Sequence, residues 1–215
     1  MGRHIITCAS WFSLIYLLLC LVNPAPAEVE QERAEAYFKE AASICQRDGG
    51  RLWGISLCGP MVFADRRTQT LATNQPHPAG DWPRLLGFTN APLEWGGSRW
   101  AAYMWDFSTA PPTSRARGEV KLHELFHRIQ PDLELMTLSG HNPHLDPVEG
   151  RIWLRLEWRA LSRALDQSGE DRKRAVSDAV AFRSARRSQF ANAAENERVE
   201  EIREGLAQYT GIVVT

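Results

Sequence analysis

An amphipathic stretch with two regularly spaced histidines constrains the fold of this chain more than any other feature. From Arg117 onward, apolar residues recur at helical spacing until Pro131 ends the pattern. The same stretch contains His123-Glu124-Leu125-Phe126-His127. Residues i and i+4 share one face of a helix, so the fold must bury one side of this helix and keep both imidazoles together on another. The apolar side chains that form the stripe are Val120, Leu122, Leu125, Phe126 and Ile129.

Two imidazoles at this spacing can bind one metal ion, and the glutamate between them can reach a water on that metal. A catalytic zinc needs a third protein ligand and one open position for water. A third histidine of the same motif would require Gly and His at positions that hold Gln130 and Leu133. The remaining candidates for the third zinc ligand are acidic residues of a later helix and histidines of the following loop. They are Glu197, Glu200, Glu201, Glu204, His141 and His144.

A second segment resembles the gluzincin metallopeptidases. Residues 204–211, Glu-Gly-Leu-Ala-Gln-Tyr-Thr-Gly, look like the Glu-Gly-x-Ala segment of that superfamily. In the superfamily, this glutamate is the third zinc ligand, on a helix that follows the HExxH helix. The resemblance therefore implies that His123, His127 and Glu204 hold Zn²⁺ and that Glu124 is the general base.

The resemblance covers two short segments, about 119–131 and 196–211. Seventy-six residues separate the second histidine from Glu204, which is longer than the usual spacing, so the intervening helices are expected to form an inserted hairpin. Related sites often carry a carboxylate one turn after the third ligand, where this chain has Gln208, a neutral acceptor. Phrases that look like an exported bacterial branch of the superfamily stand at residues 52–54, 57–60 and 156–161.

The activity that the resemblance implies is hydrolysis of a peptide or protein substrate by a zinc-activated water, with Glu124 taking its proton. Tyr209 is a candidate oxyanion partner, and the alternative for it is a core aromatic that closes the last helical turn. The segment 99–107 is a candidate for binding the substrate backbone as an added strand. The alternative function is a non-catalytic zinc-binding envelope protein with a scaffolding or binding role. The chain stops eleven residues past Glu204, which favours a truncated copy of the domain or a shallow pocket.

The first 27 residues are typical of a secretory signal. Arg3 and His4 precede an uncharged apolar run, residues 5–22, and a small-residue site follows at Ala25-Pro26-Ala27. We expect cleavage after Ala27, which leaves residues 28–215 as a metallopeptidase-like domain, exported to the periplasm or secreted. In the alternative, residues 5–22 remain as an uncleaved membrane anchor, and only then is the membrane a partner.

Cys45 and Cys58 are the two cysteines of the exported part. In an oxidising compartment they are most simply one disulfide, worth about 2–3 kcal/mol of stability for so short a loop.

The remaining pattern predicts an α+β fold, with a small N-terminal sheet packed on a helical half that carries the HExxH helix. On the helix at 148–165, Glu157 lies within the apolar stripe and is expected to pair with an arginine. The residues expected to point inward there are Ile152, Trp153, Leu154, Trp158, Leu161 and Leu165. Helices are expected at residues 28–47, 148–165, 171–190 and 192–209, and strands at 52–64, 69–74 and 99–107.

The charge balance gives no support to a nucleic-acid partner. The chain has 25 Lys and Arg against 26 Asp and Glu, a formal net charge of -1. Proteins that bind nucleic acid need a basic face, and this balance provides no excess of basic residues.

Overall fold

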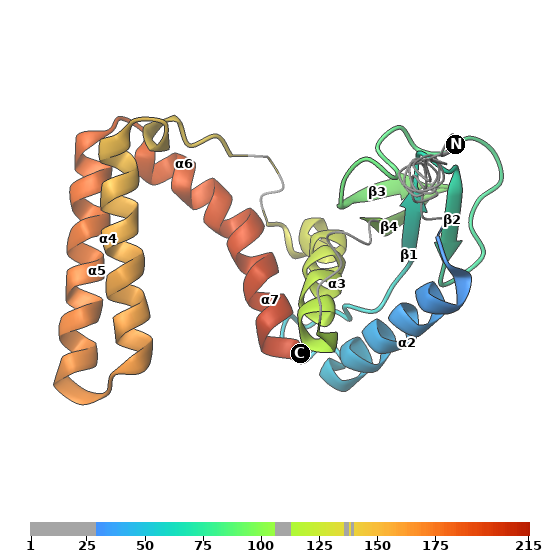
Figure 1. Cartoon of the computed structure of the whole chain (residues 1–215), viewed down its shortest axis with the longest axis horizontal. Helices are drawn as coiled ribbons and strands as arrows, with labels where there is room; N and C mark the ends of the chain where they lie inside the picture. The colour runs from blue at the N-terminus through green and yellow to red at the C-terminus, as the bar shows by residue number, and fades with distance from the viewer. Residues whose placement is uncertain (1–28, 106–112, 136–137, 139) are drawn as a thin grey trace, which may run out of the picture.

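A four-stranded sheet and a set of helices form the α+β fold that the pattern predicts (Figure 1). The computed structural model describes residues 29–105, 113–135, 138 and 140–215. The strands are β1 (Met61–Asp65), β2 (Thr70–Thr73), β3 (Ala91–Trp95) and β4 (Ser98–Met104). The helices are α2 (Gln31–Asp48), α3 (Ser114–Ile129), α4 (Val148–Asp166), α5 (Gly169–Gln189), α6 (Ala193–Glu200) and α7 (Leu206–Val214), with short 3₁₀ turns at Gln130–Leu133 and Pro143–Leu145.

The sheet has the order β2-β1-β4-β3, with β1 parallel to β4 and the other pairs antiparallel. Two expectations need correction. The predicted strand at 52–64 is shorter than expected, since β1 begins only at Met61. The residues before it are not extended strand, because Gly54 has a positive φ of 74° and the chain is irregular as far as Pro60. The predicted strand at 99–107 is the internal strand β4, so it is not an edge that could receive a substrate strand; the edge strands are β2 and β3. Residues 106 and 107 lie outside the described ranges.

Both faces of the sheet are covered, as the apolar residues on both faces of β4 indicate. On one face, Phe63, Tyr103 and Trp105 pack against α2 and α3 in the larger core. On the other face, Trp95 and Trp100 form a second cluster with the loop between β2 and β3. The sheet is therefore a rigid support on which α3 lies.

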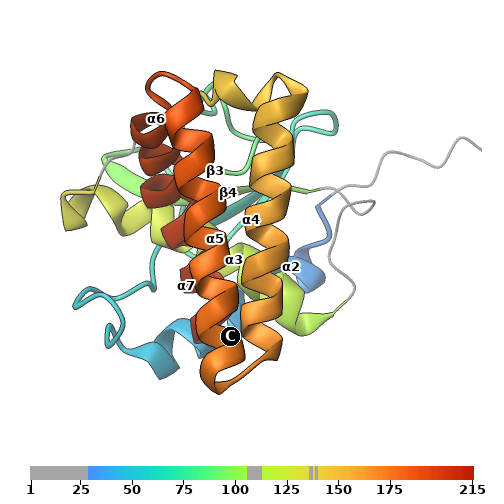
Figure 2. The same cartoon turned by 90° about the vertical axis from the view of Figure 1, so that its left-hand side faces the viewer.

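The segment between α3 and α6 includes a helical hairpin, α4 and α5, that stands beside the rest of the molecule (Figures 1 and 2). This is the inserted hairpin that the long spacing predicts. The two helices meet through small side chains, since the residues buried along their contact are Ala160, Ala164, Ala175 and Ala179.

The expected inward face of α4 is wrong for four of its six residues. Trp158 and Leu165 are 60% and 81% exposed, and Ile152 and Leu161 are also exposed. The periodicity correctly identifies an apolar stripe, but α5 packs on the neighbouring alanine face instead. The other two residues of the expected set are half-buried, and Trp153 packs on Phe182 of α5.

Buried ion pairs connect the hairpin to α6. Arg186 is 1% exposed and lies between two carboxylates, with Nη1 2.6 Å from Glu157 and Nε donating to Glu197 at 2.5 Å. Burial alone raises the pKa of Glu197, but hydrogen bonds from Arg186, Arg187 and His144 lower it to about 2. The expected arginine partner of Glu157 is thus confirmed, and Arg186 and Arg187 of α5 pair with Glu197 on α6.

Cys45 and Cys58 form the expected disulfide, with Cα atoms 5.3 Å apart, and it joins α2 to the chain before β1. Within the described residues, none of the helices has the length and apolarity needed to cross a membrane. The predicted signal peptide, residues 1–27, and its apolar run lie outside the described ranges.

The buried ion pairs predict a large and asymmetric stability effect. Replacing Arg186 by Met leaves Glu157 and Glu197 buried without their shared cation, so unfolding free energy should fall by about 3–5 kcal/mol in urea denaturation. The control is Arg159→Met on exposed α4 surface, expected within about 0.5 kcal/mol of wild type. Equal effects for both variants would contradict a structural role for this cluster.

Candidate metal centre

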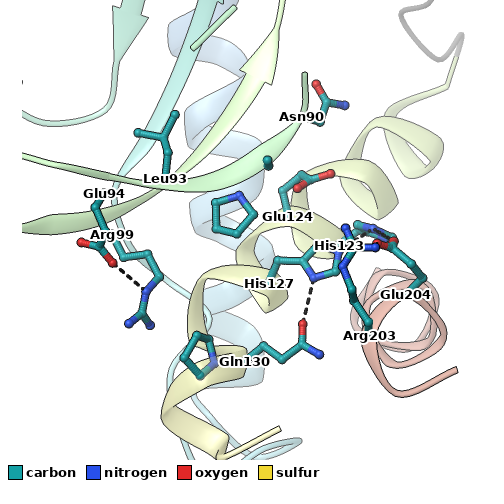
Figure 3. A pocket seen from close by; sticks show the side chains of 13 residues that line it. Asn90, Leu93, Glu94, Arg99, His123, Glu124, His127, Gln130, Arg203 and Glu204 are labelled. Carbon is teal, nitrogen blue, oxygen red and sulfur yellow. Dashed lines mark hydrogen bonds and ion pairs between the residues drawn. The ribbon is translucent and has the colours of Figure 1, made fainter. Parts of the chain in front are cut away.

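Helix α3 presents both histidines on one side and its apolar stripe on the other. Its first turn is capped by Thr113, whose side chain accepts from the N–H of Ala116 at 3.1 Å. Leu122, Leu125 and Phe126 are fully buried in the core. The imidazoles of the motif project from the adjacent face toward the helix that contains residue 204 (Figure 3).

Glu204 lies in a π turn, Glu201–Gly205, between α6 and α7. A π turn accommodates one extra residue within an α-helix and often marks a functional site. Here it rotates residue 204 relative to a regular continuation of α6, and its carboxylate meets the histidines of α3 (Figure 3). The sequence predicts a helix over this region but gives no sign of the π turn.

Three ligand atoms converge at this point. Glu204 Oε2 lies 3.2 Å from His123 Nε2 and 3.4 Å from His127 Nε2, and the two Nε2 atoms are 3.1 Å apart. Ligand atoms bound to zinc at about 2.0–2.1 Å stand roughly 3.3 Å apart in a tetrahedron. The triangle therefore has the size that one tetrahedral zinc requires, and the donor set, two imidazoles and a carboxylate, is that of catalytic zinc sites.

Two glutamines hold the imidazoles. His127 Nδ1 lies 2.9 Å from Gln130 Oε1, so the Nδ1 proton is donated to the amide oxygen and the Nε2 lone pair faces the ligand triangle. The Gln130 amide in turn donates to the carbonyl of Ile202 at 3.3 Å, which connects α3 to the π-turn region. Gln208 hydrogen-bonds His123, so it occupies the supporting position that the resemblance implies.

Burial lowers the pKa of His123, and the neighbouring His127 lowers it further despite the opposing effect of Glu204. A lowered pKa favours the neutral imidazole, which is the form that binds a metal.

Arg203 fixes the other oxygen of the acidic ligand. Its Nη1 lies 2.9 Å from Glu204 Oε1, the oxygen that does not face the histidines. The guanidinium thus occupies one oxygen and leaves Oε2 for a metal. Arg203 also lines the cavity in front of the site.

Glu124 is buried at the edge of the same site and only 6% exposed. Its Oε2 atom has no hydrogen-bond partner among the described residues. Burial raises its pKa to about 8, and the negative charge of Glu204 contributes to the rise. A carboxylate kept close to a metal site, desolvated and without a partner on one oxygen, is suited to take a proton from a water or a substrate.

A cavity of about 310 Å³ opens in front of these residues. One wall is α3 with Glu124 and the histidines, the opposite wall is the edge strand β3, and Arg99 and Arg203 lie at its rim (Figure 3). Strand β3 lies at the edge of the sheet and lines the cavity, and an edge strand can bind an extended peptide as an added strand.

The structure separates the other candidates from this cluster. His144 is buried against Glu197 at 2.8 Å, in the ion-pair cluster of the hairpin, and Glu201 pairs with Arg183. His141, in the loop before it, is exposed and is not part of the ligand triangle. Tyr209 is half-exposed on α7 and does not line the cavity, so the oxyanion role is not supported by its position.

The sequence analysis does not predict three parts of the site: strand β3, Gln130 and Arg203. For the first two, the sequence contains a pattern that could have indicated them. The Gly96-Gly97 pair, with φ values of 60° and 77°, is the two-residue turn of a hairpin, and it identifies β3 ahead of β4. Gln130 stands one helical turn after His127, where a side chain can support the ring. Arg203 had no sequence signal beyond its position next to Glu204.

Comparison of the chain with protein-family models, with curated proteins and with solved structures finds no match in any of the three. The function of the site must therefore be argued from its own geometry and from the motif resemblance.

Removal of the amide that supports His127 should weaken metal binding. In Gln130→Met the imidazole loses the acceptor that fixes its tautomer, and zinc affinity is expected to fall about 10–100-fold in a chelator-competition titration. Gln75→Met, at an exposed loop position, serves as the matched control and should bind zinc like wild type. Unchanged affinity in Gln130→Met would exclude this supporting role.

The raised pKa of Glu124 also predicts how the metal-free protein responds to pH. Because the folded state binds this proton more tightly than the unfolded state, the contribution of Glu124 to stability is fully present below pH about 4.5 and is lost as pH rises through about 8. The slope is at most about 1.4 kcal/mol per pH unit. Urea denaturation in the presence of a chelator should show this loss relative to Glu124→Gln, and a pH-independent difference between the two proteins would contradict it.

Proposed function

We propose that the protein is a zinc-dependent metallopeptidase whose site is built from His123, His127, Glu204 and Glu124. The observation that carries the proposal is the ligand triangle with sides of 3.1–3.4 Å, next to a buried carboxylate with a free oxygen. A purely structural ion pair would need neither the orphaned carboxylate nor the cavity beside it. The motif resemblance supports the same assignment.

In the proposed hydrolysis, each residue of the site has a separate role. When it is bound, Zn²⁺ would lower the pKa of its water towards about 7 and would polarise the scissile carbonyl, and its positive charge would also lower the pKa of the Glu124 carboxyl. Glu124 accepts the water's proton through its free oxygen and returns it to the leaving amine. Gln130 and Gln208 keep the two imidazoles oriented.

The substrate binding proposed here uses the cavity wall opposite α3. An extended peptide pairs with the edge strand β3, which brings its backbone across the front of the ligand triangle. Arg203, at the rim, replaces Tyr209 as the candidate for balancing negative charge on the oxyanion, because it lies in the cavity and Tyr209 does not.

The proposed location of the protein is outside the cytoplasm. The disulfide between Cys45 and Cys58 fits an oxidising compartment, where such bonds persist, and the signal-like residues 1–27 point to the same destination.

The decisive variant is Glu124→Gln, which keeps the shape of the side chain and removes its basicity. We expect zinc stoichiometry to be unchanged and peptide hydrolysis, measured on a peptide library, to fall about 10²–10⁴-fold. Glu119→Gln, on the same helix but in a surface ion pair with Arg115, is the matched control and should leave both properties intact.

His127→Ala should lose zinc and hydrolysis together. If wild type binds zinc but cleaves no peptide, and Glu124→Gln behaves like wild type in every assay, the non-catalytic zinc protein is the correct function and the peptidase proposal is wrong.

A further inference from the structure

Strand β3 carries a proline, Pro92, in the middle of the cavity wall. Proline has no N–H, so it removes one hydrogen-bond donor from whichever side of the strand its backbone faces. Within sheets, proline is found on edge strands where that side faces away from the neighbouring strand. The hydrogen bonds of β4 establish that Pro92 has this orientation.

The two sides of β4 can be assigned residue by residue. Ala101 donates its N–H to a carbonyl just before β1 at 2.9 Å, so odd-numbered residues of β4 face β1. Met104 donates its N–H to the side chain of Asn90 at 2.8 Å, so even-numbered residues face β3. Because hydrogen-bonded and non-hydrogen-bonded pairs alternate in an antiparallel ladder, the residues of β3 that bond β4 are 91, 93 and 95. The backbone groups of Pro92 and Glu94 therefore face the free edge.

This free edge offers two acceptors and one donor to a peptide. The acceptors are the carbonyls of Pro92 and Glu94, and the donor is the N–H of Glu94. None of these three groups has a hydrogen-bond partner within the described residues. On β2, the other edge strand, Gln31 already donates to the carbonyl of Leu71 at 2.9 Å. Strand β3 is thus the edge that is open to a peptide, and it lacks a donor at one position.

The missing donor lies at the level of the HExxH motif. The β4 partner of Pro92 stands between two residues that contact α3. On one side, Arg99 donates to the carbonyl of Arg128 at 2.8 Å. On the other side, Tyr103 donates to the carbonyl of Lys121 at 2.7 Å. The midpoint between these two contacts along α3 is the centre of the motif.

A peptide that pairs with this edge keeps one carbonyl without a partner. At the level of Pro92 the peptide can donate its N–H to the proline carbonyl, but its own carbonyl finds no N–H on β3. A scissile carbonyl must be free to be polarised by the metal and attacked by the water. Because Pro92, Glu124 and both histidines line one cavity, the carbonyl without a partner lies where the chemistry takes place (Figure 3).

We propose that Pro92 is a positioning residue that sets the register of the bound substrate by leaving the scissile carbonyl free. Antiparallel pairing is more stable per residue than parallel pairing. In that arrangement, the residue that contributes the scissile carbonyl lies opposite Pro92 and donates its N–H to the proline carbonyl. The residue two positions nearer the N-terminus of the peptide exchanges both hydrogen bonds with Glu94, and the residue between them points its N–H away from β3.

The inference rests on the proposed function and extends it to the class of substrate. The substrate is an extended peptide whose backbone is recognised on the N-terminal side of the cleaved bond. Side chains contribute less to this contact, since all three groups that β3 offers belong to the backbone.

Ester substitution in the peptide tests the register. Mass spectrometry first locates the bond that wild type cleaves in a peptide of the library. Analogues of that peptide each replace one backbone N–H by an ester oxygen, and their dissociation constants are measured with zinc-loaded Glu124→Gln, which binds without cleaving. Esters at the first and third residues before the scissile bond should raise the dissociation constant about 3–10-fold, whereas the ester at the second residue is the matched control and should leave it unchanged.

The outcomes separate this inference from the proposed function. If wild type cleaves the peptide but the ester effects are reversed, absent, or confined to residues after the scissile bond, the register is wrong and the proposed function stands. If the protein binds zinc and cleaves no peptide, the proposed function fails and the inference fails with it.

Pro92→Ala supplies the missing donor and tests the residue itself. The new N–H bonds the scissile carbonyl in the bound substrate but not in the transition state, so kcat and KM should fall together by about 3–10-fold while kcat/KM stays unchanged. Pro147→Ala, at an exposed position before α4, is the control and should have wild-type kinetics.

Unchanged kcat and KM in Pro92→Ala overturn the inference, even where the variant self-associates. In that case the proline only prevents edge strands of separate chains from pairing. The ester series retains the native proline, so it tests the register whether or not Pro92→Ala folds.

Discussion

The close approach of α7 to α3 is the constraint on which the site depends. A Cβ atom at Gly211 would lie 2.5 Å from the carbonyl oxygen of Glu119, so only glycine allows this spacing. Ala207 and Thr210 are fully buried in the same contact, and Trp53 donates to the Thr210 hydroxyl. The small residues after Glu204 in the gluzincin-like segment thus have a packing role, since they let the helix lie near enough for its acid to reach both histidines.

The two ends of the helical segment from α6 to α7, which contains Glu204, are fixed by different interactions. Apolar and small-residue packing against α3 holds α7, whereas the buried cluster around Arg186 holds α6 to the hairpin. The π turn lies between these two attachments, where one extra residue adjusts the direction of Glu204 without breaking the helix. The inserted hairpin is therefore part of the support of Glu204.

The parts of the fold that follow from local periodicity could be predicted, and those set by tertiary contacts could not. HExxH with its apolar stripe predicts α3 and the histidine pair from spacing alone, and the cysteine pair predicts the disulfide. Glu204 could be chosen among its acidic neighbours only through the resemblance, because the π turn that orients it has no sequence pattern. Four of the six residues expected to point inward on α4 are exposed, because periodicity identifies an apolar face but not the element that covers it.

Zinc K-edge X-ray absorption on the purified protein tests the central claim, that three side chains converge on one cation, most directly. The account predicts one zinc per chain with nitrogen and oxygen ligands at about 2.0–2.1 Å, including two imidazoles, and loss of that signature in Glu204→Ala. Absence of stoichiometric zinc, or an identical spectrum after Glu204→Ala, would contradict the claim that these residues form a metal centre.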